Sequence, residues 1–153
     1  MASKAKSQIP IVDIFAGPGG LGEGFSTYTD GRGHRPFKIA ISVEKEPNAH
    51  KTLLLRSFYR QFLGDVPPDE FYQHLRGETD YDEFLTKIQD TEEGRNAILE
   101  ARQHELSKDP AKDAELSKEI AAKIGNQDCI LIGGPPCQPF SKAGYWVQFT
   151  KWP

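Results

Sequence analysis

A cluster of glycines directly after an apolar run is the feature that most restricts the fold of this chain. The run covers residues 9–15 and is rich in β-branched and aromatic residues; the glycines are Gly17, Gly19, Gly20 and Gly22. This pattern is typical of a buried strand that enters a tight turn and then a helix, here predicted through about Tyr28. A second strand is predicted at residues 37–44, and Pro47 suits the first turn of a second helix. Alternating strands and helices favour a parallel α/β sheet.

The middle of the chain has a different character. Residues 65–124 are charged and rich in alanine, without strand-like runs, and we expect a helical insertion there. Asp109 and Pro110 are typical of a helix start, and Gly125 of a helix end. Apolar residues at helical spacing predict a buried stripe on two helices: Leu54, Phe58 and Phe62 on one, and Leu116, Ile120 and Ile124 on the other.

Length and composition are those of one globular domain, with 153 residues, of which 37% are hydrophobic. No apolar run approaches the roughly 20 residues that cross a bilayer, so we expect a cytoplasmic protein with no membrane partner. The net charge of −3 gives no general electrostatic argument for nucleic acid, and a DNA function must rest on motifs. Two cysteines and four histidines show no zinc spacing, and no metal is expected.

The glycine cluster has the chemistry of a cofactor loop. Without a Cβ, glycine lets the backbone approach a ligand closely, and Gly17, Gly19 and Gly22 match the G-x-G-x-x-G pattern. Glu44 ends the next predicted strand, where an acid can accept the hydroxyl protons of a ribose. These residues leave nicotinamide and methyl-donor cofactors both open, and a glycine turn can also serve only to connect a strand and a helix.

The second chemical motif follows a predicted strand at residues 129–132. The sequence Gly-Gly-Pro-Pro-Cys-Gln-Pro-Phe-Ser begins at Gly133 and places Cys137 after two prolines that fix the backbone. A thiolate is a soft nucleophile, so Cys137 is a candidate for covalent catalysis. The alternative for Cys137 is a small buried residue in a proline-rich turn. Cys129 lies within the predicted strand, and we expect it to be an inert core residue.

Together these motifs resemble the first and fourth signature motifs of the DNA cytosine-5 methyltransferases. The resemblance implies a Rossmann-like fold that uses S-adenosylmethionine. It implies that Phe15 lies against the adenine, that Asp13 helps to hold the amino end of the cofactor, and that Glu44 binds the ribose. The implied cradle for the methionine part is Ala16, Gly17, Gly19, Gly20 and Leu21, and Pro135 is counted among the cofactor contacts.

For the reaction, the resemblance implies methyl transfer to C5 of a cytosine flipped out of duplex DNA. Cys137 would form a covalent adduct with the base. The carbonyl of Pro135 would take the cytosine amino group, and the other implied DNA contacts are Pro136, Gln138 and Ser141. Bacterial DNA modification in a restriction–modification system is the setting that this family favours.

The resemblance covers roughly residues 9–62 and 128–144. Gly64–Asp65 is the candidate for the third motif, and no Glu-Asn-Val string occurs. We therefore expect residues 1–153 to form a partial catalytic domain with an exposed sheet edge, without a target-recognition domain and inactive alone. One alternative is a non-catalytic remnant or half-enzyme that needs a second polypeptide; a weaker one is a nicotinamide-dinucleotide-binding domain.

Overall fold

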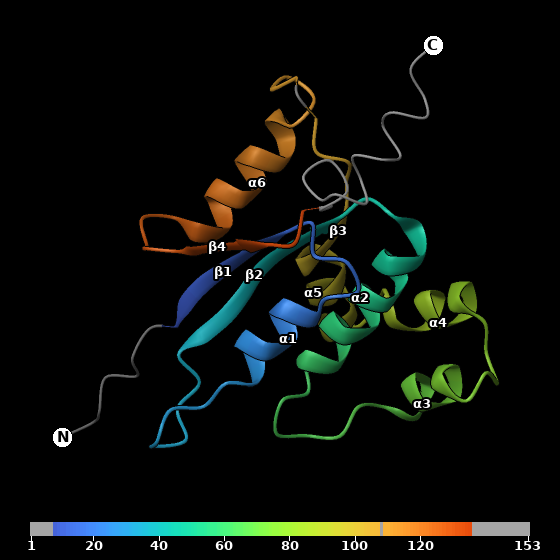
Figure 1. Ribbon diagram of the computed structural model, residues 1–153. Coiled ribbons are helices and arrows are strands. Elements are labelled where there is room, and N and C mark those ends of the chain that lie inside the picture. Colours follow the sequence, from blue (N-terminus) through green and yellow to red (C-terminus); the bar gives the residue numbers. More distant parts are fainter. Residues whose placement is uncertain (1–7, 108, 136–153) are drawn as a thin grey trace, which may run out of the picture.

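The computed structural model describes residues 8–107 and 109–135 of the chain (Figure 1). Across these residues, four strands form one parallel sheet: β1 (Ile9–Ile14), β2 (Phe37–Glu44), β3 (Ala101–Gln103) and β4 (Ile130–Gly133). Six helices connect them: α1 (Gly20–Thr27), α2 (Pro47–Arg60), α3 (Asp69–Leu75), α4 (Tyr81–Ile88), α5 (Glu92–Glu100) and α6 (Ala114–Ile124). In the described part of the chain, no helix is long and apolar enough to cross a membrane.

The strand order is β3-β2-β1-β4. The chain therefore moves outward from β1 through β2 to β3, and then returns to the other side of β1 as β4. Helix α6 covers one face of the sheet, while α1, α2 and α5 lie on the opposite face (Figure 1). Such a doubly wound sheet has a switch point between β1 and β4, where ligands bind outside the carboxyl ends of the strands. The α/β fold predicted from the sequence is confirmed.

Alternation along the strands supplies two cores, one on each face of the sheet. Val12, Ile41 and Val43 pack on the α6 side with the buried Leu116. Ile120 and Ile124 are partly buried against the same cluster, so the predicted stripe of α6 is confirmed. Gly125 ends this helix with a φ of 60°, as its position in the sequence indicated.

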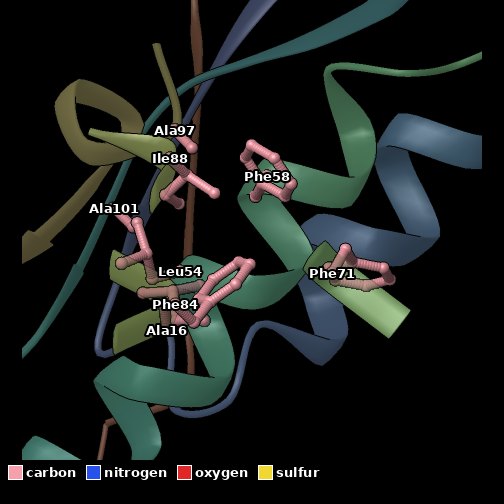
Figure 2. Packing of buried hydrophobic residues seen from close by; sticks show 9 residues of the cluster. Ala16, Leu54, Phe58, Phe71, Phe84, Ile88, Ala97 and Ala101 are labelled. Atoms are coloured by element: carbon pink, nitrogen blue, oxygen red, sulfur yellow. The ribbon is translucent and has the colours of Figure 1, made fainter. Parts of the chain in front are cut away.

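The second core is aromatic and lies between α2 and the following helices (Figure 2). Phe58 of α2 is 1% exposed, and its ring centroid lies 6.0 Å from that of Phe71 and 5.6 Å from that of Phe84. Leu54 is buried beside it, and Phe62 is partly buried against the cluster, as the predicted stripe of α2 required. The cluster fixes α3, α4 and α5 against α2 and so determines where β3 begins.

Two local predictions for the middle segment are wrong. Residues 101–103 form a strand, although Ala-Arg-Gln carries no apolar run, because they extend the sheet by pairing with Ser42–Glu44 at the edge of β2. Helix α6 starts at Ala114 and not at Pro110, because residues 110–113 form turns. The Asp113 carboxylate, at the N-cap position of α6, binds His104 and the Ser107 amide instead of capping the helix.

Candidate active site at the carboxyl ends of the strands

The two sequence motifs meet where β1 and β4 end. The strands are parallel, and Ile14 is the register partner of Gly133. A Cβ built on Gly133 would overlap the carbonyl oxygen of Ile14, and one on Gly134 would lie 3.8 Å from the Phe15 oxygen. The glycines thus let the backbone leading to the cysteine motif run directly beside the start of the glycine loop. Pro135 follows and is exposed.

The glycine loop has a backbone that ordinary residues rarely adopt. Phe15, Gly17 and Gly19 have φ values of 56°, 57° and 89°. The loop is tied to the sheet by the Ala16 amide, which donates to the Val43 carbonyl at 3.0 Å, and the Gly19 amide donates to Ala16. A Cβ on Gly19 would stand 2.8 Å from Cδ1 of Leu53, so the loop also lies tightly on α2. Helix α1 starts at Gly20, and Leu21 is 49% exposed.

Glu44 lies at the carboxyl end of β2 and faces the loop. Its Oε2 accepts a hydrogen bond from the Gly17 amide at 2.8 Å, and its Oε1 accepts one from the Glu46 amide at 2.8 Å. The carboxylate is half-buried and remains accessible. The structure therefore brings the predicted ribose-binding acid to the glycine loop and shows that this acid also holds the loop.

Asp13 has a different environment from the other motif residues. It is fully buried, and neither carboxylate oxygen has a hydrogen-bond partner among the described residues. Its side chain lies under α1, because a Cβ on Gly22 would approach Oδ2 to 3.3 Å. Burial raises the pKa of Asp13, and the nearby Gly22 amide and Arg60 guanidinium offset only part of this effect. The carboxyl group is thus a buried group beneath the loop and has no exposed surface.

A pocket of about 80 Å³ opens beside the loop. Phe15 lines it from the end of β1, and Val43 and Lys45 line it from the end of β2. The third wall is the segment after β3, with His104, Glu105 and Leu106. This side of the pocket was not predicted from the sequence. The candidate for the third motif, Gly64–Asp65, lies in the turns after α2 and not on a strand. No local sequence signal marks this segment, because its place depends on the pairing of β3 with β2.

The segment after β3 is held in place by polar contacts. Lys45 Nζ binds Glu105 Oε1 at 3.2 Å, across the pocket mouth. His104 Nε2 lies 2.7 Å from Asp113 Oδ1, and the Ser107 amide donates to Asp113 Oδ2 at 2.9 Å. These contacts lower the pKa of Asp113, with the His104 hydrogen bond as the main cause. Asp113 therefore holds the segment after β3, which lines one side of the pocket.

The remaining predicted site residues lie outside the described residues; they are Pro136, Cys137, Gln138 and Ser141. The backbone that leads to them is described as far as Pro135. A larger cavity of about 350 Å³ lies at the other end of β2, against Lys38, Ile39 and Ala40. None of the motif residues lines it, so we assign the candidate site to the loop and its smaller pocket.

In the described residues, a doubly wound parallel sheet carries a glycine loop after β1 and an acid at the end of β2. This is the arrangement of a Rossmann-like nucleotide-binding domain. Comparison with known proteins shows similarity to DNA methyltransferases. A sequence model described as C-5 cytosine-specific DNA methylase matches residues 87–151. The resemblance predicted from the first and fourth motifs is therefore confirmed.

Two curated relatives are type II methyltransferases. Type II methyltransferase M.Bpa9945I of Bacillus paralicheniformis is 26% identical over 148 residues, which cover 88% of this chain and 32% of the relative. Type II methyltransferase M.SacI of Streptomyces achromogenes is 24% identical over 148 residues, which cover 92% of this chain and 27% of the relative. The chain thus spans about a third or less of the length of these relatives. No solved structure gave a significant match.

Proposed function

We propose that this chain is the part of a DNA cytosine-5 methyltransferase that binds the methyl donor and carries the nucleophile. The proposed enzyme modifies duplex DNA in a bacterial restriction–modification system, in line with the names of the two type II relatives. One observation carries the proposal: the glycine loop and the Gly133–Pro135 segment lie side by side at the switch point, with Glu44 facing the loop.

The residues present fit a nucleoside cofactor. A Cβ on Gly17 or Gly20 would meet no atom within 4 Å among the described residues, so the loop backbone borders open space. The pocket beside Phe15 suits a flat base. Val43 and Lys45, the chain neighbours of Glu44, line this pocket, while Glu44 itself bonds the loop at Gly17, where it can accept ribose hydroxyl protons. We assign the adenine to the Phe15 pocket, the ribose to Glu44 and the methionine part to the loop backbone from Ala16 to Leu21.

S-adenosylmethionine supplies an electrophilic methyl group when it is bound. In the proposed reaction the Cys137 thiolate attacks C6 of a flipped cytosine, and the 5,6 double bond opens so that C5 becomes nucleophilic. After methylation, loss of the C5 proton restores the double bond and releases the thiolate. Pro135 accepts from the cytosine amino group through its carbonyl, while Pro136, Gln138 and Ser141 contact the DNA.

Cofactor binding tests the proposal directly. Calorimetric titration with S-adenosylhomocysteine should show one site, and NAD should show none. Glu44→Gln keeps the size of the side chain and removes its charge, so it should weaken binding by roughly tenfold or more, as expected for hydrogen bonds to a charged group. Glu83→Gln is the matched control, because the Glu83 carboxylate pairs with Lys87 on the surface of α4, away from the glycine loop. Binding of NAD without S-adenosylhomocysteine would contradict the proposal.

The nucleophile needs a separate experiment. A duplex that contains 5-fluorocytosine traps the covalent adduct, since fluorine cannot leave as a proton does. We expect the adduct when the residues absent from this sequence, such as a Glu-Asn-Val motif, are supplied by a longer chain or a second polypeptide. Cys137→Ser should abolish it, and an adduct that survives in this variant would refute the assignment. Methylation by residues 1–153 alone would show that no further residues are required.

A further inference from the structure

Helix α1, which follows the glycine loop, has little stability of its own. It is eight residues long, and three of them are glycines (Gly20, Gly22 and Gly24). Glycine is among the weakest helix formers, and isolated helices of this length do not persist in water. Its N-cap is Gly19, which has no side chain to cap the first turn. The position of α1 must therefore come from contacts with the rest of the fold.

Those contacts include one strong polar link. Glu23 Oε2 lies 3.1 Å from Arg60 Nη1 of α2, and this is the ion pair that α1 makes among residues 8–107 and 109–135. The other contacts are apolar or small: the Phe25 and Phe37 rings meet edge to face at 5.2 Å, and Ser26 and Gly22 are buried. Glu23 lies one turn after Gly19, so a shift of Glu23 moves the loop with it.

Arg60 is suited to fix this position. Its side chain is only 4% exposed, and the guanidinium is shared between two helices. Nε donates to Glu100 Oε1 of α5 at 3.2 Å and Nη2 donates to the same oxygen, while Nη1 is left for Glu23. A buried guanidinium that loses a partner is costly, and its planar fork permits few alternative directions. Glu100 therefore fixes the orientation of the Arg60 guanidinium. That orientation determines the position at which Glu23 can bind Nη1.

We propose that Glu23 and Arg60 are positioning residues that hold α1, and with it the glycine loop, in the conformation that binds the cofactor. This inference rests on the proposed function for its ligand, although the bracing of α1 can be measured without one. Neither residue lines the pocket beside Phe15, so both act through the backbone of α1.

The test combines amide hydrogen exchange with titration of S-adenosylhomocysteine on the full chain. Glu23→Ala removes the carboxylate and raises helix propensity, so faster exchange in residues 20–27 must come from the lost charge, through the ion pair with Arg60 and the weaker interaction of a first-turn acid with the helix dipole. We expect exchange there to rise by roughly tenfold and affinity to fall by a similar factor, as for a partly buried pair. Glu83→Ala is the matched control, since it removes a surface pair in α4 and should change neither quantity.

Arg60→Lys is a second variant. Lysine keeps the positive charge but lacks the planar guanidinium that binds Glu23 and Glu100 at the same time. Exchange in residues 20–27 should then lie between wild type and Glu23→Ala. Unchanged exchange in Glu23→Ala would overturn the inference, and so would faster exchange with undiminished affinity. If wild type binds no S-adenosylhomocysteine, the proposed function fails, while the exchange data still decide whether the pair braces α1.

Discussion

The carbonyl oxygen of Ile14 occupies the space that a side chain on Gly133 would need. The two residues are register partners in β1 and β4, and this contact sets the spacing between the glycine loop and the segment that leads to the cysteine motif. The absence of a side chain at Gly133 is therefore a requirement of strand pairing, independent of any ligand.

Gly133→Ala should separate the ends of β1 and β4. The added methyl group meets backbone, which cannot rotate away, so we expect a loss of about 2–3 kcal/mol in the free energy of unfolding, at the upper end for overpacking. Urea denaturation measures the loss. Gly31→Ala is the control, because among the described residues no atom beyond its chain neighbours lies within 4 Å of its Cβ position, and a similar loss there would refute the explanation.

Gly19→Ala and Gly24→Ala should have opposite effects. Gly19 has a φ of 89°, and its Cβ would press on Leu53, so alanine should cost about 1–3 kcal/mol. Gly24 lies inside α1 with free space around it, and alanine there should stabilise by about 0.4–1 kcal/mol. Thermal or urea unfolding of both variants measures the two changes in the free energy of unfolding. Changes of the same sign would contradict the assigned roles.

Asp13→Asn should change how stability depends on pH. Burial holds the pKa of Asp13 above its ordinary value of 3.8. A raised pKa in the folded state means that the carboxyl group favours folding most below pH 3.8, and that this contribution is lost as the pH rises through the folded value. Asparagine does not ionise, so the stability of the variant does not change with pH through this position. The stability of the variant relative to wild type should therefore increase from pH 3.8 toward neutral, and a constant or falling difference in urea unfolding would contradict this.

Asp113→Asn should show the opposite trend. The His104 hydrogen bond and the Ser107 amide hold the pKa of Asp113 below 3.8, so its contribution is present above pH 3.8 and is lost as the pH falls through the folded value. The variant should be less stable than wild type at neutral pH, and the two should converge in acid. Asp109→Asn is the control, since Asp109 is an exposed turn residue whose carboxylate accepts from the Ala111 amide at 3.0 Å. Its effect should not follow this pH dependence.

The parts of the fold that could be predicted are those with strong local patterns. The apolar runs of β1 and β2 and the glycines after β1 marked the centre of the sheet, and Glu44 was identified from its place at a strand end. Leu54 and Phe58 were placed on a buried helix face by their spacing alone. In each case the local pattern and the tertiary environment agree, which is why a single sequence is sufficient.

The remaining parts depend on contacts between distant residues. β3 is a strand only because it pairs with the edge of β2. The sequence Ala-Arg-Gln shows no alternation of apolar and polar residues that would predict a strand. The wall at His104 could not be found for the same reason. No local pattern marks Arg60 and Glu100 as buried, because only the packing of α5 on α2 brings them together. The residues beyond Pro135, including Cys137, stay predictions.

The pairing of β1 with β4 affects how the chain folds. Ile11 and Ile130 are neighbours in the sheet although roughly 120 residues separate them, and contacts of such long sequence separation slow folding. During synthesis, β1 and β2 leave the ribosome long before β4, and β1 then presents an open edge that can pair with another chain. The nascent protein is thus most prone to aggregation in the interval before residues 130–133 emerge.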